Sequence, residues 1–163
     1  MSFDWSRFTQ TIKIKADVPT IYNLWATRSG IESWFLRMGE FSRDGNVIGE
    51  NEQIAAGDTS RWLWHGYPDT VLETGKILEA NGKDRVQFVF GEAGIVTVEI
   101  KDLGNGLSEM SITQTDIPTD EHGKQNYHVG CSSGWTFYRC NMKSILLGGA
   151  DIRNKENNND MND

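Results

Sequence analysis

Histidine and cysteine are the residue types in this chain that could bind a metal ion or act in nucleophilic catalysis. The chain contains His65, His122, His128, Cys131 and Cys140. A zinc site needs three or four such ligands that converge, but the spacing of the last two histidines directs them to different sides of a helix. His128 and Cys131 could form a base and nucleophile pair, yet both fall on a packing face. We therefore expect no metal, no cofactor and no catalytic residue.

Three polar residues carry a different signal, because the periodicity places them on inward faces. His128 lies on the packing face of a predicted helix, Arg139 lies at its edge, and Gln114 lies on an inward strand face. Such groups need partners when buried. They either bond to one another, to backbone or to trapped water, or they orient a ligand in an apolar pocket. The second interpretation predicts a ligand-binding set made of Trp62, Trp64, Phe88, Phe90, Met110, Gln114, His128, Trp135, Tyr138 and Arg139.

A long helix from His122 to Leu147 must position the last residues of this set. At about 100° per residue, one half of this helix is apolar and aromatic-rich and the other half is polar. The packing half contains Tyr127, His128, Cys131, Trp135, Tyr138, Met142, Ile145 and Leu146; Ser133, Thr136, Asn141, Lys143 and Ser144 lie opposite. A core helix that covers a sheet gives the same pattern as a helix that covers a ligand cavity, and one helix can do both.

The chain before this helix reads mainly as short alternating strands. A first strand over 8–15 is followed by short helices over Val18–Ala26, capped by Asp17, and over Gly30–Phe35, capped by Ser29. Two weak strands are expected within 38–58, and the alternation then predicts strands at 57–66, 70–80, 85–90, 95–103 and 107–116. A broken alternation near Gly75 predicts a bulge or a sharp bend there. Asn-Gly pairs at 81–82 and 105–106 predict hairpins and therefore an antiparallel meander.

Length and charge limit the partners of the chain. The 163 residues fit a single domain, over 1–150, followed by a polar tail at 151–163 that we expect to be disordered. A formal net charge of -7 argues against binding to nucleic acid or to an anionic membrane surface. We see neither a spanning segment nor a signal peptide, so we expect a cytoplasmic protein. The two cysteines cannot pair within one helix, because their positions place them about 13.5 Å apart along its axis.

Several short patterns follow one another along this order of elements. They are Ile21-Tyr-Asn-Leu-Trp25, Ile31-Glu-Ser-Trp34, Gly57-Asp58 before Trp62-Leu-Trp-His-Gly66, Gly75-Lys-Ile-Leu-Glu79, and Gly134-Trp135 before Met142-Lys143. In these the chain resembles START-like (SRPBCC) domains, and most of all the homologues of the heat-shock-protein-90 ATPase activator. The resemblance implies an α+β helix-grip fold: a curved antiparallel sheet of six to seven strands wrapped around a long C-terminal helix, with two short helices after the first strand.

The predicted set and the resemblance together give three functional hypotheses. The first is a non-catalytic module that binds a small hydrophobic or aromatic molecule between the sheet and the last helix. The second is an enzyme of the polyketide cyclase or aromatase kind, which resembles this fold and uses the same cavity. The third is an interaction module that engages a chaperone ATPase. We expect a monomer or a weak dimer in each case.

Overall fold

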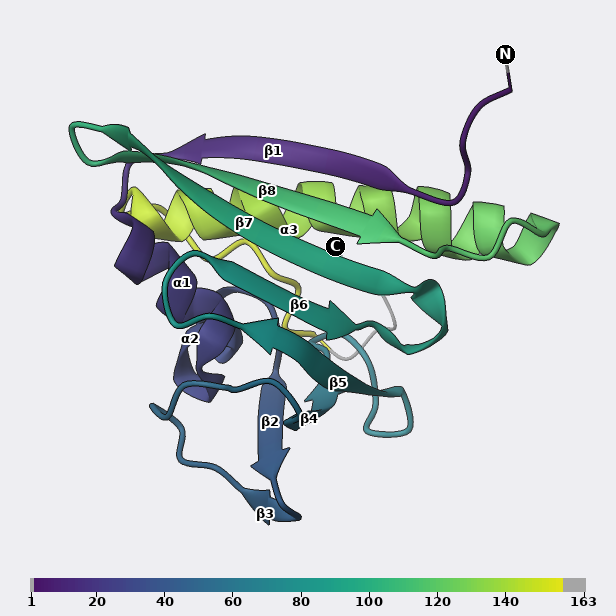
Figure 1. The fold of residues 1–163 in the computed structure, drawn as a ribbon, viewed down its shortest axis with the longest axis horizontal. Coiled ribbons are helices and arrows are strands. Elements are labelled where there is room, and N and C mark those ends of the chain that lie inside the picture. Colours follow the sequence, from purple (N-terminus) through teal and green to yellow (C-terminus); the bar gives the residue numbers. More distant parts are fainter. Residues whose placement is uncertain (1, 157–163) are drawn as a thin grey trace.

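The computed structural model of the protein describes residues 2–156. Its eight strands form one antiparallel sheet, and the helices lie against one face of that sheet (Figure 1). The α+β helix-grip fold predicted from the sequence is confirmed, with eight strands in place of six to seven. The strands, in the order in which they neighbour one another, are β1 (Phe8–Ile14), β8 (Leu107–Thr115), β7 (Ile95–Gly104), β6 (Arg85–Val89), β5 (Leu72–Ala80), β4 (Thr59–Leu63), β2 (Met38–Arg43) and β3 (Asn46–Val47).

Two short helices follow β1, as predicted. Helix α1 (Val18–Ala26) begins after Asp17, whose side chain accepts a hydrogen bond from the backbone N–H of Thr20 over 3.0 Å. Helix α2 (Arg28–Trp34) is capped by Thr27, which accepts from the N–H of Gly30 over 3.0 Å. The prediction that Ser29 caps this helix is wrong, because the hydroxyl of Ser29 instead donates to the side-chain oxygen of Asn51 over 2.6 Å.

The middle strands position the aromatic core of the molecule. Trp62 on β4 and Phe88 on β6 are buried, and their ring centroids lie 5.1 Å apart. The irregularity of β5 that the sequence predicted near Gly75 lies slightly further along the strand, between Ile77 and Glu79, where the pairing with β6 shifts. Gly75 remains paired with β4, and a Cβ at this position would lie 2.2 Å from the carbonyl oxygen of Val89. The glycine therefore permits a close backbone approach, and the strand continues through it.

The long C-terminal helix has two parts. A π-helical segment, η2 (Gly123–Val129), runs directly into the α-helix α3 (Gly130–Leu146). The wide turn of a π-helix rotates its residues relative to an ideal α-helix, so a single helical wheel does not describe the whole stretch. Trp135, Tyr138 and Met142 are buried as predicted. Asn141, predicted on the outer half, is 0% exposed, which corrects that assignment.

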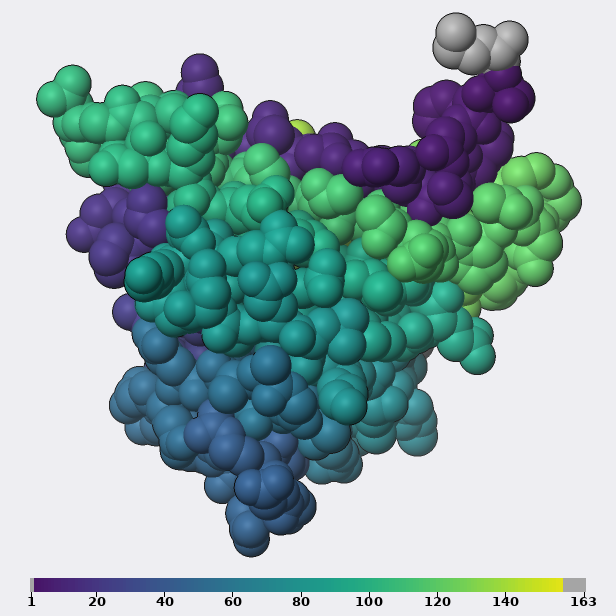
Figure 2. Space-filling model, viewed as in Figure 1, coloured from purple at the N-terminus to yellow at the C-terminus, as the bar shows by residue number. Residues whose placement is uncertain are grey.

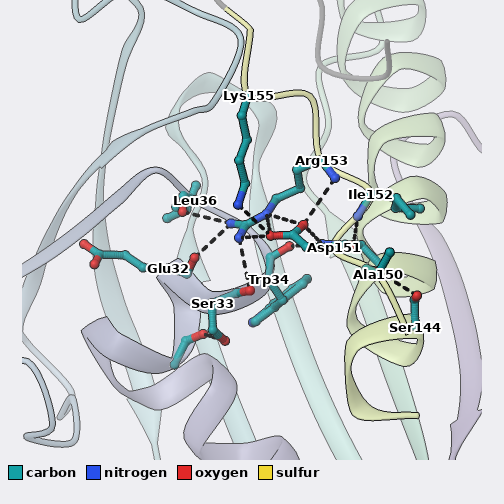
Figure 3. Close-up of polar contacts among 12 residues, drawn as sticks. Glu32, Ser33, Trp34, Leu36, Ser144, Ala150, Asp151, Ile152, Arg153 and Lys155 are labelled. Atoms are coloured by element: carbon teal, nitrogen blue, oxygen red, sulfur yellow. Dashed lines mark hydrogen bonds and ion pairs between the residues drawn. The ribbon is translucent and has the colours of Figure 1, made fainter. Parts of the chain in front are cut away.

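The chain after α3 returns to the helices and packs against them. Arg153 donates from Nη1 to the carbonyl oxygens of Glu32 (2.9 Å) and Leu36 (3.1 Å), and from Nη2 to that of Ser33 (3.1 Å) (Figure 3). Its guanidinium also pairs with the carboxylate of Asp151 at 2.7 Å. The prediction of a disordered tail from 151 onward is therefore wrong for 151–156, and its remainder, 157–163, lies outside the described residues.

Asn141 connects this C-terminal strap (residues 151–156) to α3. Its side-chain nitrogen donates to the carbonyl oxygen of Trp34 over 2.8 Å, and its oxygen accepts from the backbone N–H of Ile152 over 2.8 Å. A buried amide with both ends paired is a stable arrangement. The strap thus covers α3 at Asn141, a position that sequence periodicity assigned to the outer half of the helix.

Asp58 is the buried carboxylate of the loop before β4. Arg43 donates to it from Nε over 2.9 Å and from Nη2 over 2.8 Å, and the N–H of Ala55 donates over 2.8 Å. Burial alone would raise the pKa of Asp58, but these hydrogen bonds outweigh burial and hold the pKa below its ordinary value. The ionised form therefore stabilises the fold above the unfolded value of 3.8, and this stabilisation is lost as the pH falls through the lower folded value.

Replacement of Asp58 with asparagine should accordingly lower Tm at a pH of about 7, and the gap to the wild type should narrow as the pH approaches about 2. Asp69→Asn is the matched control, because Asp69 pairs with Arg37 but its side chain is 78% exposed. That variant should change Tm very little. Thermal unfolding followed by circular dichroism at several pH values measures both effects. A gap for Asp58→Asn that did not change with pH would contradict the assignment.

Candidate functional site

A cavity of about 220 Å³ lies between α3 and the ends of the middle strands. Aromatic rings form most of its walls, and the helix side is lined by small residues. The lining residues are Phe35, Trp64, Phe90, Asn126, Gly130, Cys131, Gly134, Trp135 and Tyr138. The cavity is therefore mainly apolar, with few polar groups, which is the usual composition of a small-molecule site.

Trp135 is the central wall of this cavity. Its ring centroid lies 5.1 Å from that of Phe35 and 5.7 Å from that of Phe90. Its indole Nε1–H donates to the side-chain oxygen of Gln114 over 2.9 Å, and Gln114 Nε2 donates to the carbonyl oxygen of Ala93 over 2.9 Å. Gln114 thus fixes the orientation of the indole from behind, and does not itself line the cavity.

The structure brings four of the predicted ligand-binding residues into the cavity, namely Trp64, Phe90, Trp135 and Tyr138. Three others, Trp62, Phe88 and Met110, belong to the buried core. Met110 Sδ accepts a hydrogen bond from the indole of Trp25 over 3.2 Å.

His128 and Arg139, also predicted, lie away from the cavity. The ring of His128 packs against the N-terminal segment, with Nδ1 2.9 Å from the carbonyl oxygen of Trp5. The space-filling view shows this segment, in purple, beside the light-green stretch of the chain to which η2 belongs (Figure 2). Arg139 donates to the carbonyl oxygen of Thr11 on β1. The π-helical turn accounts for the position of His128. The Thr11 carbonyl that Arg139 binds belongs to β1, the edge strand of the sheet.

Two glycines on α3 were not predicted as part of the site. Gly130 and Gly134 are one helical turn apart and both line the cavity. A Cβ at Gly134 would meet no atom within 4 Å, and one at Gly130 would meet only the carbonyl oxygen of Gln125, at 3.6 Å. Glycine in a helix interior costs about 0.8–1.0 kcal/mol relative to alanine. Close packing does not explain the presence of glycine at these two positions, because a larger side chain would fit. The effect of the glycines is to leave open space beside the cavity.

Glu73 is an inward-facing carboxylate that sequence reasoning missed, and it is not among the residues that line the cavity. It lies directly opposite Trp62 in the pairing of β4 and β5, so it shares the inner face of the sheet. Only His128, Arg139 and Gln114 were predicted as inward polar residues, because the alternation on this strand is broken near Gly75. The alternating positions 73, 75 and 77 on β5 were the signal that could have revealed it.

The ionisable groups around the cavity are shifted toward their neutral forms. Burial raises the pKa of the Cys131 thiol and, strongly, that of the Tyr138 hydroxyl. Burial also raises the pKa of Glu73, and the nearby charge of Glu92 adds to this effect. Within residues 2–156 there is no group of three or more histidine, cysteine, aspartate or glutamate residues that could hold a metal ion.

The two thiols should differ in reactivity. Both are free, and Cys140 is exposed whereas Cys131 is partly buried. The thiolate is the reactive form, so burial and a raised pKa should make alkylation of Cys131 slower than that of Cys140 by about tenfold or more. Mass spectrometry of peptides after timed alkylation measures both rates. Equal rates, or an intramolecular disulfide in the native protein, would contradict the structure.

The arrangement defines a helix-grip fold with an aromatic cavity under the long helix. The sequence matches no protein-family model and no curated protein. Solved structures do match. The Aha1 dimer from Colwellia psychrerythraea is 16% identical, with a TM-score of 0.65, over 86% of this chain and 95% of that one. An HSP90 activator from Plasmodium falciparum is 16% identical, with a TM-score of 0.61, over 88% and 96%.

A third match is a protein of the dynemicin biosynthetic locus, which is 12% identical, with a TM-score of 0.68. The match covers 92% of this chain and 50% of that one. At these identities the similarity shows the fold alone. It agrees with the START-like and activator-like resemblance drawn from the sequence motifs. None of the helices within residues 2–156 is long and apolar enough to cross a membrane.

Proposed function

We propose that this protein binds a small hydrophobic or aromatic molecule in the cavity under α3. The observation that carries the proposal is the pair Gly130 and Gly134, which leaves unfilled space beside aromatic walls at a cost in helix stability. A helix selected only to cover a sheet would gain from alanine or a larger apolar residue at both positions. The volume of about 220 Å³ is below the usual range of about 300–1,000 Å³ for drug-sized ligands, so the ligand has one or two rings.

The chemistry of the cavity favours binding over catalysis. A general acid and base pair needs two titratable groups in opposed environments. Cys131 and Tyr138 both have a raised pKa, so both remain neutral and are weak proton donors. Two alternatives remain for the experiment below to separate. The first is a cyclase or aromatase, the alternative considered because one neighbour comes from the dynemicin biosynthetic locus. The second is a module that activates a chaperone ATPase, as the similarity to an HSP90 activator suggests.

The test fills the cavity from the helix side. Gly134→Leu should abolish binding of naphthylmethanol, a neutral two-ring probe, because the new side chain occupies the space in which the ring would lie. Ser133→Leu is the matched control, since it adds the same side chain to an exposed position one residue away on the same helix. Ligand-observed NMR titration measures the affinity, and circular dichroism confirms that both variants are folded.

Wild type and Ser133→Leu should bind the probe with similar affinity, and Gly134→Leu should bind it at least about tenfold more weakly. Equal binding by all three proteins would place the probe elsewhere and refute the proposal. Mass spectrometry of the probe after incubation tests the cyclase alternative, because a chemically altered product would show turnover. A chaperone ATPase stimulated equally by wild type and Gly134→Leu would favour the interaction module instead.

A further inference from the structure

The hydroxyl of Tyr138 is a polar group in the cavity wall that has no hydrogen-bond partner among residues 2–156. Tyr138 is 4% exposed, and its ring packs edge-on against Phe35 with the ring centroids 4.8 Å apart. The unpartnered polar atoms that this part of the chain seals from solvent are Trp62 Nε1 and Arg139 Nε. The Tyr138 hydroxyl is not one of them and therefore keeps contact with open space. The open space beside this buried side chain is the cavity.

The groups around this hydroxyl offer donors and leave it without an acceptor. Arg153, the charged residue that acts on the hydroxyl from the strap, carries donors only. Trp135, the other buried donor of the wall, already donates to Gln114 over 2.9 Å. Trp64 is half-buried, and its Nε1–H, which can only donate, also has no partner in the described part of the chain. A buried donor without an acceptor is unfavourable, and a ligand that supplies an acceptor would remove this cost.

The wall of the cavity is uncharged. The described residues that line it include no lysine, arginine, histidine, aspartate or glutamate. Burial raises the pKa of the Tyr138 hydroxyl and of the Cys131 thiol, so both groups stay protonated at neutral pH. A charged ligand group would lose its hydration here without meeting an opposite charge. The acceptor that suits this cavity therefore belongs to a neutral group.

We propose that the cavity takes a neutral aromatic carbonyl compound, such as an aryl ketone, whose carbonyl oxygen accepts a hydrogen bond from the hydroxyl of Tyr138. Its ring lies against the rings of Phe90 and Trp135. The inference rests on the proposed function, because it specifies the class of ligand for the same cavity. A carbonyl group brings an acceptor and no donor of its own, so it pairs with the tyrosine and leaves no further polar hydrogen unpaired among the aromatic walls.

The test compares two probes of the same shape in three proteins. 2-Acetonaphthone and 2-isopropenylnaphthalene share a ring system and differ in a C=O group against a C=CH2 group. The measured quantity is the ratio of the two affinities from ligand-observed NMR titration. Tyr138→Phe should lower the preference for the ketone about five- to tenfold relative to wild type, mainly through weaker binding of the ketone, because the variant lacks the donor. Tyr127→Phe is the matched control, since Tyr127 does not line the cavity and donates to Glu92 over 3.1 Å. It should keep the wild-type ratio.

The stability of Tyr138→Phe gives a second readout. The phenylalanine keeps the ring that packs against Phe35, and the lost hydroxyl has no partner among residues 2–156, so Tm without ligand should be no lower than that of wild type. A Tm lower by several degrees would show that the hydroxyl is bonded within the protein, and would overturn the inference.

The affinity ratios separate the remaining outcomes. An equal ratio in wild type and Tyr138→Phe would overturn this inference and leave the proposed function in place, because the probes would still bind. A ratio that falls as much in Tyr127→Phe as in Tyr138→Phe would also overturn it. If neither probe nor naphthylmethanol binds to wild type, the proposed function and this inference both fail.

Discussion

Replacing Trp135 with alanine should lower the free energy of unfolding by about 3–5 kcal/mol. The side chain is 2% exposed and contacts rings from α1, the end of α2 and the segment after β6. Its removal leaves a large void and also deprives the buried oxygen of Gln114 of its hydrogen-bond donor. The same change removes the main wall of the cavity, so binding of naphthylmethanol should be lost as well.

Urea unfolding of Trp135→Ala and Trp135→Phe separates these contributions. The phenylalanine variant retains a ring but no donor for Gln114, so its loss should be smaller, about 1–2 kcal/mol. A loss below about 1 kcal/mol for Trp135→Ala would mean that the indole is not packed between the sheet and the helix as described.

Arg153→Ala should be the second most damaging change, with a loss of about 3 kcal/mol. The side chain is 5% exposed and its guanidinium satisfies three backbone carbonyls at the end of α2 besides the carboxylate of Asp151. Carbonyls at a helix C-terminus have no partner within the helix, and a cation there is favoured by the helix dipole. Without the guanidinium, these acceptors and Asp151 lose their shared partner.

Lys155→Ala provides the control for the strap. Lys155 also pairs with Asp151, at 3.2 Å, but its side chain is 56% exposed. Exposed pairs contribute little, so this variant should lose no more than about 0.5–1 kcal/mol. Urea unfolding of both variants checks the difference. Equal, small losses would show that the strap does not hold α2 and that the polar tail begins at Asp151 after all.

Local patterns in the sequence were sufficient for most of the fold. The alternation of strands, the Asn-Gly hairpins and the cap at Asp17 depend on residues close in sequence, and each is present in the structure. The resemblance of ordered motifs indicated how these elements pack. The pattern could not show the π-helical turn at 123–129, because a wheel assumes one helical period throughout.

The site was less predictable, because its parts meet only in three dimensions. The aromatic walls Trp64, Phe90, Trp135 and Tyr138 followed from inward faces. Asn141 was misplaced because its partners lie in α2 and in the strap after α3. Gly134 was missed for a related reason: a glycine acquires meaning as part of a cavity only when the opposite wall is known.

Protection of Cys131 tests the central claim, that a small hydrophobic molecule occupies this cavity, most directly. Cys131 lines the cavity and Cys140 is exposed on the same helix, so one alkylation experiment contains its own reference. With naphthylmethanol at about ten times its Kd, alkylation of Cys131 should slow about tenfold while that of Cys140 stays unchanged. An unchanged rate at Cys131 under conditions in which NMR shows the probe to be bound would contradict the account.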